Sequence, residues 1–491
     1  MTGSERSRYM QFNSYLCILV VVPAFVACYF LAARIRSSLT KAVVIAFGAG
    51  FCIYGGWESA AVLGVSLILN LLVSFALIKW SRFRKPLLVL DIVLNAALLF
   101  YYKYFNFALT TVNGIWGTDY KTVSLILPLG ISFYTFQQIM YVVSVYRESI
   151  PRVRVSDYLS FSLFFPKLVM GPLAEPKEFI DQLNNPGQKK IRPENIACGI
   201  KLFSFGLFKK MVLADTFARG VSWGYTNLAS ATAADLFLVM LFYSFEIYFD
   251  FSGYCDMATG ISKMVNITLP MNFDSPYKAL SIRNFWKRWH ITLTGFLTKY
   301  IYYPLGGSRK GKTRTYANIL LVFLISGLWH GANWTFVLWG LLHGLLQVAE
   351  RIIRLPVRRW QSPLRFVYTF LAVSLLWLLF RADSIAQWGE ILAKMFSFRS
   401  MAVSDGLIQS FILPETAFLV DKLDFFGLNN LVTGLPMLVI TVSALLICLI
   451  PENNYRSQDK ISYAGMILCA AVFVWAFLCL STESVFVYAG F

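Results

Sequence analysis

Three histidines occur in the chain, and one of them lies in a setting that suits proton transfer. His330 belongs to the sequence SGLWHGAN, residues 326–333. Glycines on both sides of its tryptophan–histidine pair let the backbone bend and let a second molecule approach closely. Because imidazole titrates near neutral pH, it can take a proton from a hydroxyl and return it to a leaving thiolate. We therefore expect His330 to act as a general base, although buried histidines in membrane proteins often serve only as hydrogen-bonding groups.

The other two histidines have different surroundings. His290 lies in a basic and aromatic segment, so we expect it either to form a second wall of the same site or to sit at the membrane interface. His343 lies in an ordinary helical sequence and is expected to have a packing role. Catalytic candidates are therefore His330 and His290.

Three carboxylates lie within an apolar stretch. Glu246 and Asp250 are four residues apart and share one helical face, and Asp256 follows shortly after. Charged groups of this kind avoid lipid and find partners inside the protein. We expect all three to pair with the basic residues at 283–290, in an ion-pair network rather than in catalysis.

Basic residues gather just before His290. Arg283 and Lys287 suit two roles equally well: contact with the phosphates of a large anionic donor such as coenzyme A, or anchoring on the cytoplasmic side. Trp286 and Asn333 complete the predicted substrate-binding set. The eight cysteines lie mostly in apolar runs and form no CxxC pair, so no metal site, permanently bound cofactor or disulfide framework is predicted.

The amino-acid composition indicates the class of protein in which these residues are positioned. Hydrophobic residues make up 57% of the 491 positions and charged residues 14%, which is typical of an all-α, polytopic membrane protein. The net charge of +18 does not indicate nucleic acid, because most Lys and Arg lie in short loops between apolar runs. One multi-pass domain, 1–491, is expected in the lipid bilayer.

Apolar runs then give the expected elements. Predicted spans are 14–34, 42–58, 60–79, 87–108, 122–146, 195–215, 235–254, 365–381, 432–450 and 461–482. Shorter or polar segments have other predicted roles: a re-entrant piece at 158–174, a cytoplasmic loop at 175–194, an amphipathic helix at 284–304 and an external segment at 382–430 with a helix at 385–396. Ten crossings plus a hairpin place both termini outside.

The hairpin is predicted from residues 316–350. As one straight helix this run would be about 52 Å long, against a hydrocarbon core of roughly 30 Å. Basic residues flank it at 309–314 and 351–359, which favours entry and exit on the same, cytoplasmic side. We expect the break at 326–333, with His330 near the tip of the hairpin. The aromatic cluster 100–105 is expected to form an interfacial belt near the outer face.

Five stretches closely resemble signatures of the membrane-bound O-acyltransferase family, and most of all its alginate O-acetyltransferase branch. They are LPLGISFYTFQQIMYVVSVYR (127–147), FFPKLVMGPL (164–173), YFDFSGYCDMATGISKM (248–264), FWKRWHITLTGFLTKYIYYPLGGSRKG (285–311) and SGLWHGANWTFVLWGLLHG (326–344). The resemblance covers about 50–350 and is weaker in the C-terminal helices, 365–482.

The resemblance implies a ring of tilted helices, with short and re-entrant helices around a thin central floor and a funnel from each face. It implies His330 of the WHG motif as the catalytic base and His290 of the WH motif as its companion. It also implies acetyl-CoA as donor substrate and an extracytoplasmic polysaccharide as acceptor, with a separate SGNH-hydrolase-like acetyltransferase as partner. A bacterial cytoplasmic membrane is the implied location.

Two alternatives stay open at this point. One is a D-alanyl transferase of teichoic acid modification, which takes its acyl group from a carrier-protein thioester. The other is a proton-coupled transporter of polysaccharide precursors, for which paired inverted repeats are expected but none is found in the sequence. No GxSxG, Walker A, GxGxxG or HExxH motif is present, so the residue chemistry alone does not separate an enzyme from a transporter.

Overall fold

A computed structural model describes residues 10–353, 362–413, 417, 429–460, 462–481 and 486. Every regular element within these residues is helical. The α-helices are α1 Val22–Ile35, α2 Leu39–Tyr54, α3 Trp57–Lys79, α4 Arg84–Leu99, α5 Phe105–Trp116, α6 Ile131–Tyr146, α7 Val155–Ser162, α8 Phe165–Leu168, α9 Pro176–Asn184, α10 Pro193–Phe208, α11 Asp215–Thr226, α12 Ala233–Met264, α13 Ile282–Trp286, α14 Ile291–Leu297, α15 Lys312–His330, α16 Trp334–Ile353, α17 Ser362–Arg381, α18 Ile385–Met395, α19 Asp405–Gln409, α21 Asn429–Leu449 and α22 Tyr463–Leu478. Four π-helical segments continue neighbouring helices: η1 Cys17–Val21, η3 Phe100–Tyr104, η5 Lys209–Ala214 and η7 Thr298–Tyr302. The predicted all-α fold is confirmed.

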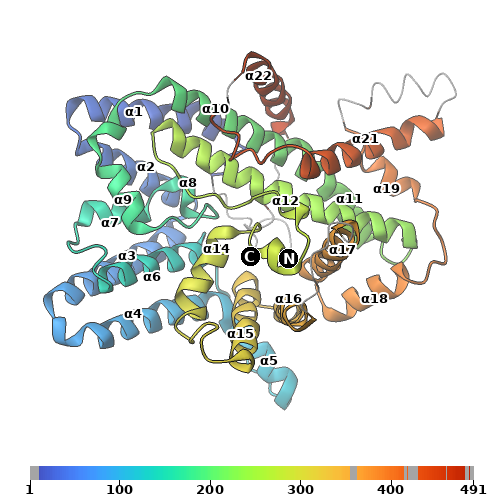
Figure 1. Ribbon diagram of the computed structural model, residues 1–491, viewed down its shortest axis with the longest axis horizontal. Coiled ribbons are helices and arrows are strands. Elements are labelled where there is room, and N and C mark those ends of the chain that lie inside the picture. Colours follow the sequence, from blue (N-terminus) through green and yellow to red (C-terminus); the bar gives the residue numbers. More distant parts are fainter. Residues whose placement is uncertain are drawn as a thin grey trace.

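Helix α12 runs through the middle of the molecule (Figure 1). Its 32 residues are buried around almost the whole circumference, which explains why its sequence mixes apolar, aromatic and acidic residues instead of showing one apolar stripe. The helix begins at a capping box, in which Thr232 and Asp235 each accept a hydrogen bond from the other residue's backbone N–H. This cap sets the start of the central helix.

Helices α10 and α12 form an antiparallel pair that packs on glycines. A Cβ atom built on Gly206 would lie 2.6 Å from the carbonyl oxygen of Gly253, and one built on Gly253 would lie 2.7 Å from that of Gly206. Gly199 and Gly260 approach one another in the same way. Small residues at such contacts let two backbones approach closely, and this is how helices in membranes commonly associate.

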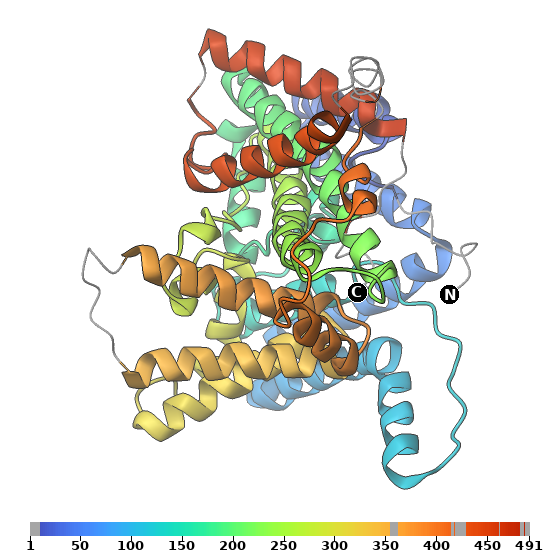
Figure 2. The same cartoon turned by 90° about the vertical axis from the view of Figure 1, so that its right-hand side faces the viewer.

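The remaining helices surround this pair in groups (Figure 1). Helices α1 to α4 and α6 lie to one side. Helix α17 packs against α12, α16 packs against α17, and α15 packs against α16. Figure 2 shows α21 and α22 at one end of the molecule and α15 and α16 at the opposite end. Helix α5 projects from the body, and Asn106 joins it to the adjoining irregular segment through two hydrogen bonds with Val123.

Five helices among the described residues are long and apolar enough to cross a membrane. They are Cys17–Ile35, Trp57–Lys79, Ala233–Met264, Trp334–Ile353 and Ser362–Arg381. The predicted spans at 42–58, 432–450 and 461–482 match the shorter apolar helical stretches Leu39–Tyr54, Thr433–Leu449 and Tyr463–Leu478. The predicted topology of ten crossings with both termini outside stays a prediction.

Several predicted boundaries were wrong. The span expected at 122–146 is helical only from Ile131, because Pro128 and the left-handed Gly130 hold the preceding segment in an irregular conformation. The helix expected at 87–108 continues through η3 to Trp116, and the one expected at 195–215 continues through η5 and α11 to Thr226. The loop expected at 175–194 contains α9, which Pro176 opens at its first position.

Other predictions agree with the structure. The piece at 158–174 consists of the short, buried helices α7 and α8 followed by buried irregular chain, and the amphipathic helix at 385–396 is α18. Of the predicted external segment at 382–430, residues 414–416 and 418–428 lie outside the described residues. Residues 354–361 of the basic flank and the end of the span at 461–482 lie outside them as well.

Candidate active site

The predicted hairpin is confirmed and places His330 at its turn. Helix α15 ends at His330, and α16 begins at Trp334. Gly327 lies within α15 and not at the break: a Cβ atom there would meet the backbone of Phe336 and lie 3.2 Å from Cα of Gly340. The two glycines expected to flank a bend therefore differ in role, since Gly327 permits close packing of the two helices and Gly331 ends α15.

His330 is buried among aromatic rings, with a side chain only 3% exposed. Ring centroids of Trp329, Trp339 and Phe380 lie 4.9, 5.2 and 5.2 Å from its own. All three contacts are close to edge-to-face. Such a setting excludes water and holds the imidazole in a fixed orientation, as a proton-transfer group requires.

His290 is held by a break in the chain. The single amphipathic helix predicted at 284–304 is wrong: α13 ends at Trp286, and His290 adopts a left-handed conformation with φ 44° before α14 begins. A non-glycine residue in this region costs roughly 1–2 kcal/mol, so the surrounding structure must impose it. Trp286 and Trp289 are both buried, which contradicts a position on the membrane surface.

Asn272 imposes this arrangement and was missed in the sequence. Its Oδ1 accepts hydrogen bonds from the backbone N–H of Thr292 at 3.2 Å and from the Thr292 hydroxyl at 2.9 Å, and its carbonyl accepts from Ile291 at 2.9 Å. The same Oδ1 lies 3.2 Å from Nδ1 of His290. No motif spacing links position 272 to position 290, because the contact depends on how the loop between α12 and α13 folds back.

This contact assigns the His290 tautomer. A backbone N–H can only donate, so the Asn272 atom that faces Thr292 is the oxygen. Nδ1 of a neutral His290 must then carry the proton, and its Nε2 keeps a lone pair. That Nε2 is buried and has no hydrogen-bond partner among the residues that the structure describes. His290 is therefore arranged to accept a proton or a hydrogen bond from a bound molecule.

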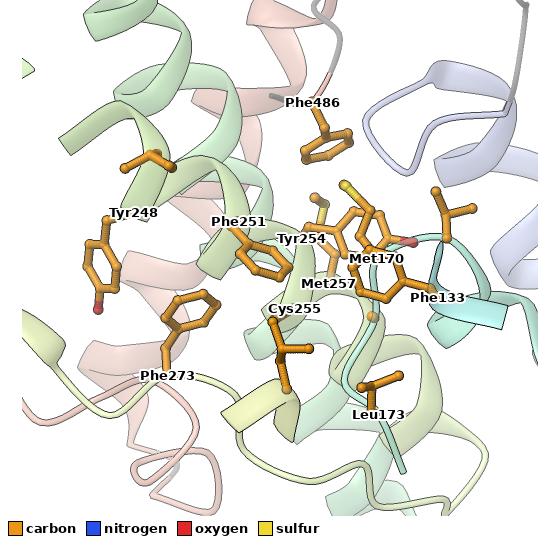
Figure 3. Packing of buried hydrophobic residues seen from close by; sticks show 14 of the residues in the cluster. Phe133, Met170, Leu173, Tyr248, Phe251, Tyr254, Cys255, Met257, Phe273 and Phe486 are labelled. Carbon is orange, nitrogen blue, oxygen red and sulfur yellow. The ribbon is translucent and has the colours of Figure 1, made fainter. Parts of the chain in front are cut away.

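Aromatic side chains of α6 and α12 form the wall around His290. The ring centroid of Phe251 lies 4.8 Å away, edge to face, and that of Phe133 lies 6.3 Å away in a stacked orientation. Figure 3 shows Phe251 and Phe273 beside one another and Phe133 next to Tyr254 and Met170. The imidazole of His290 is therefore surrounded by aromatic rings from α6, α12 and α15.

His343 lies in packed surroundings, in agreement with the packing role expected for it. Trp286 donates a hydrogen bond from its indole nitrogen to Nδ1 of His343 at 3.3 Å, and both side chains are buried. Trp286 was predicted to bind substrate, but the structure places it against Phe323, Trp339 and His343. This contact fixes the end of α13 to α16.

Two tryptophans connect the three histidines. Centroid distances are 6.0 Å from His290 to Trp329, 4.9 Å from Trp329 to His330, 5.2 Å from His330 to Trp339 and 4.8 Å from Trp339 to His343. We call these five residues the histidine–tryptophan row. The structure thus brings together the two histidines predicted to be catalytic and places the packing histidine at the far end.

The carboxylates do not pair with the basic residues at 283–290. Asp250 forms an ion pair with Lys210 at 2.8 Å, and Asp256 forms one with Lys209 at 2.6 Å. Both lysines belong to η5, which packs along α12. Glu246 is buried close by on α12. The expected ion pairs exist for Asp250 and Asp256, but their partners were predicted wrongly, because the pairing depends on the register of η5 against α12.

The basic residues themselves lie on the surface. Arg283 and Lys287 are exposed, and the backbone N–H groups of Ile282 and Arg283 donate to the Glu350 carboxylate at 2.7 and 3.2 Å. This carboxylate caps the start of α13 and joins it to the end of α16. Arg283 and Lys287 are thus exposed to the surroundings, whereas Trp286 of the same segment is buried.

Asn333 closes the turn of the hairpin. Its Oδ1 accepts from the backbone N–H of Thr335 at 3.1 Å, and its Nδ2 donates to the carbonyl of Asp383 at 3.1 Å. These bonds cap α16 and attach the turn to the end of α17. The side chain predicted to bind substrate is engaged in the structure of the turn.

Two further features concern ligands. Among the described residues, no three His, Cys, Asp or Glu side chains lie close enough to hold a metal ion. An apolar groove of about 680 Å³ lies between α1, α10 and α22, with Arg34 at its edge. None of the three histidines lines it, so it is separate from the histidine–tryptophan row.

Comparison with known proteins supports the assignment of family. Residues 147–381 match the model of the membrane-bound O-acyltransferase family. The chain is 34% identical to the peptidoglycan O-acetyltransferase of Helicobacter pylori, over 98% of this chain and 97% of the relative. It is 35% identical to the probable alginate O-acetylase AlgI of Azotobacter vinelandii, over 81% of this chain and 80% of the relative.

A more distant relative is the teichoic acid D-alanyltransferase of Streptococcus thermophilus, with 27% identity over 55% of this chain and 70% of that protein. All three histidines lie within the matched family region. The near full-length similarity confirms the resemblance predicted from the five motifs. The chain therefore belongs to the membrane-bound O-acyltransferase family and is an acyltransferase.

Proposed function

We propose that this protein transfers an acetyl group from cytosolic acetyl-CoA toward hydroxyl groups of an extracytoplasmic polysaccharide, in the cytoplasmic membrane of a bacterium. The observation that carries the proposal is the placement of His330 and His290 against the same tryptophan, Trp329, inside a buried aromatic site. The names of the two most extensively aligned relatives above, which describe O-acetylation of peptidoglycan and of alginate, support the choice of acyl group and acceptor.

The chemistry assigned to the site is a base-assisted acyl transfer. His330 takes the proton of the acceptor hydroxyl as its oxygen attacks the thioester carbonyl. When the carbon–sulfur bond breaks, the proton passes from His330 to the coenzyme A thiolate. General base catalysis contributes about 10²–10⁴-fold in rate. His290, with the lone pair on Nε2, orients one of the two reactants by accepting a hydrogen bond.

Donor and acceptor enter from opposite ends of the hairpin in this proposal. Helix α15 spans 19 residues, or about 28 Å, between its basic start at Lys312 and His330. Arg283 and Lys287 are exposed near Glu350 at the end of α16, so they belong to the basic end. We assign them to the phosphates of the donor. The acceptor then approaches from the end of the hairpin that contains Asn333, and the acetyl group reaches the polysaccharide through a separate SGNH-hydrolase-like acetyltransferase.

The test uses purified protein in nanodiscs and acetyl-CoA labelled in the acetyl group. Wild type is expected to release coenzyme A and transfer label to a soluble polysaccharide fragment when the partner is supplied. His330→Ala, present at the same level in the membrane, is expected to do neither. Transfer by His330→Ala at the wild-type rate would overturn the role of His330.

A second donor distinguishes the proposed acetyl transfer from the nearest alternative, D-alanyl transfer. A D-alanyl thioester on a phosphopantetheine carrier is supplied in place of acetyl-CoA. Turnover of this thioester alone would assign the chain to teichoic acid D-alanylation, the activity named for the more distant relative. We expect turnover with acetyl-CoA alone.

A further inference from the structure

The C-terminal end of α15 is closed by two side chains from a distant segment. The Lys103 ammonium donates to the carbonyl oxygens of Trp329 at 2.5 Å and His330 at 3.3 Å. The Tyr104 hydroxyl donates to the carbonyl oxygen of Leu328 at 2.8 Å. Both donors belong to η3, more than two hundred residues earlier in the chain.

These contacts complete the hydrogen bonding of the helix end. The last four carbonyl groups of an α-helix have no partner within the helix and need one elsewhere. Gly327 accepts from the backbone N–H of Gly331 at 3.4 Å, and η3 satisfies the other three. Since Trp329 and His330 are buried, the side chains of η3 take the role that water has at an exposed helix end.

Lys103 also connects α15 to a third helix. It donates to the Ser132 hydroxyl at 3.2 Å in the first turn of α6, and its Nζ lies 5.9 Å above the ring of Trp329. The three acceptors match the three N–H donors of an ammonium group. A positive charge at this position is favoured by the dipole of α15.

The π-helical form of η3 explains how these side chains reach α15. The aromatic cluster 100–105 was predicted to be an interfacial belt, and this stays a prediction; Phe100 and Tyr101 of the cluster are about half exposed. The wider turn rotates Lys103 and Tyr104 inward. Other π segments use lysines similarly: Lys210 in η5 binds Asp250, and Lys299 in η7 binds Glu175.

We propose that Lys103 is a positioning residue for His330, acting through the backbone of the last turn of α15. The proposal rests on the proposed function, in which His330 is the base. Lys103 holds the carbonyls of residues 329 and 330 against α6, and this fixes the direction in which the imidazole of His330 points. Tyr104 supports the preceding residue of the same turn.

The first test compares Lys103→Met with Lys103→Arg in nanodiscs. Lys103→Met removes the donors while keeping an unbranched side chain, and a small displacement of a base has a large effect on rate. We expect a loss of about tenfold or more in kcat, with the KM for acetyl-CoA within about twofold of wild type. Lys103→Arg keeps the charge and donors and is expected to recover most of the activity.

Lys201→Met is the matched control. Lys201 also donates to two backbone carbonyls, those of Ser457 at 2.6 Å and Lys460 at 2.9 Å, but on the segment between α21 and α22. Its loss is expected to leave kcat unchanged. An equal loss of kcat in Lys201→Met would show a general loss of folded protein and overturn the proposal. If Lys103→Met does not accumulate, Tyr104→Phe, which removes one bond, is expected to lower kcat about threefold.

Hydrogen–deuterium exchange gives a readout that does not depend on activity. Amides of residues 331–336 are expected to exchange about tenfold faster in Lys103→Met and at the wild-type rate in Lys201→Met. Unchanged exchange in Lys103→Met would overturn the proposal, even if no donor were turned over by wild type. Failure of wild type with every donor would instead refute the proposed function, while exchange still decides the role of Lys103.

Discussion

The two segments that carry the catalytic candidates position an imidazole in opposite ways. In the α15–α16 hairpin, regular helix continues up to His330, and side chains from η3 close the helix end. In the 282–297 segment the helix is interrupted, and His290 is held in a left-handed conformation beside Asn272. The first arrangement depends on helix packing, and the second depends on one amide side chain.

This difference predicts that substitutions near His330 and near His290 have different effects. Loss of a cap at the end of α15 changes the position of His330 but leaves most of the hairpin intact, since Gly327 and Gly340 still pack the two helices closely. Loss of Asn272 removes the acceptor for both Thr292 and His290. We therefore expect substitutions near His290 to affect folding and chemistry together, and substitutions near His330 to affect mainly chemistry.

The largest expected effect comes from His330. His330→Ala is predicted to lower kcat by about 10²–10⁴-fold, the usual contribution of a general base. Steady-state coenzyme A release in nanodiscs measures this, with donor binding followed separately. If His330→Ala lost donor binding but kept kcat, His330 would be a binding residue. The proposed difference in role between His330 and His290 would then be wrong.

Substitution of His290 separates its chemical role from its backbone role. His290→Gly and His290→Ala both lose the imidazole and are expected to lower kcat about 10–100-fold. Glycine tolerates the left-handed conformation, so the glycine variant should be more stable than the alanine variant by about 1 kcal/mol. Thermal unfolding of the two variants checks this. Equal stability would show that the strain at position 290 is relieved elsewhere.

Asn272→Ala tests whether the amide selects the tautomer. Without Oδ1, His290 loses the acceptor that keeps the proton on Nδ1, and buried donors of Thr292 lose their partner. We expect kcat to fall about tenfold and the free energy of unfolding to fall by about 1–3 kcal/mol. Full activity together with lowered stability would reduce Asn272 to a purely structural residue.

The basic surface of α13 should have a smaller effect. Arg283→Gln combined with Lys287→Gln is predicted to raise the KM for acetyl-CoA a few-fold, since exposed charges contribute about 0–1 kcal/mol each. The effect should diminish at high salt, because exposed charges are screened. A change in membrane insertion with an unchanged KM would favour the anchoring alternative.

The smallest effect on activity is expected for the third histidine. His343→Phe keeps a flat ring of similar size beside Trp339 and is predicted to leave kcat within about twofold of wild type. It removes the acceptor for the indole N–H of Trp286, so the free energy of unfolding should fall by about 1–3 kcal/mol. Thermal unfolding and coenzyme A release measure the two quantities. A loss of activity as large as that of His330→Ala would contradict a packing role.

Some of the site could be predicted from the sequence because the signals are local. The hairpin, its break near residue 330 and the burial of His330 were predicted from one apolar run that is too long for a single crossing, and of the two glycines expected to flank the bend only Gly331 lies at the break. The packing role of His343 followed from its helical context. These features depend on neighbouring residues, so a one-dimensional pattern contains them.

Other parts could not be predicted, since they depend on residues far apart in the chain. The segment at 284–304 has an amphipathic composition, but the left-handed His290 and the contact with Asn272 interrupt it. Asp250 and Asp256 of α12 pair with lysines of η5 and not with the basic residues at 283–290. A lysine in an apolar run is unfavourable until a partner is known, and only packing supplies that partner.

The sequence by itself determined the class of protein, its helical character and the family, and it identified His330 and His290 as candidates, because hydropathy and motif order are properties of consecutive residues. The tertiary structure alone decided what surrounds each imidazole: the tautomer of His290, the partners of Asp250 and Asp256, and the closure of α15 by Lys103 and Tyr104. The physical reason is that a buried polar or charged group is costly without a partner. In this protein those partners come from other helices or loops, which only the folded chain brings together.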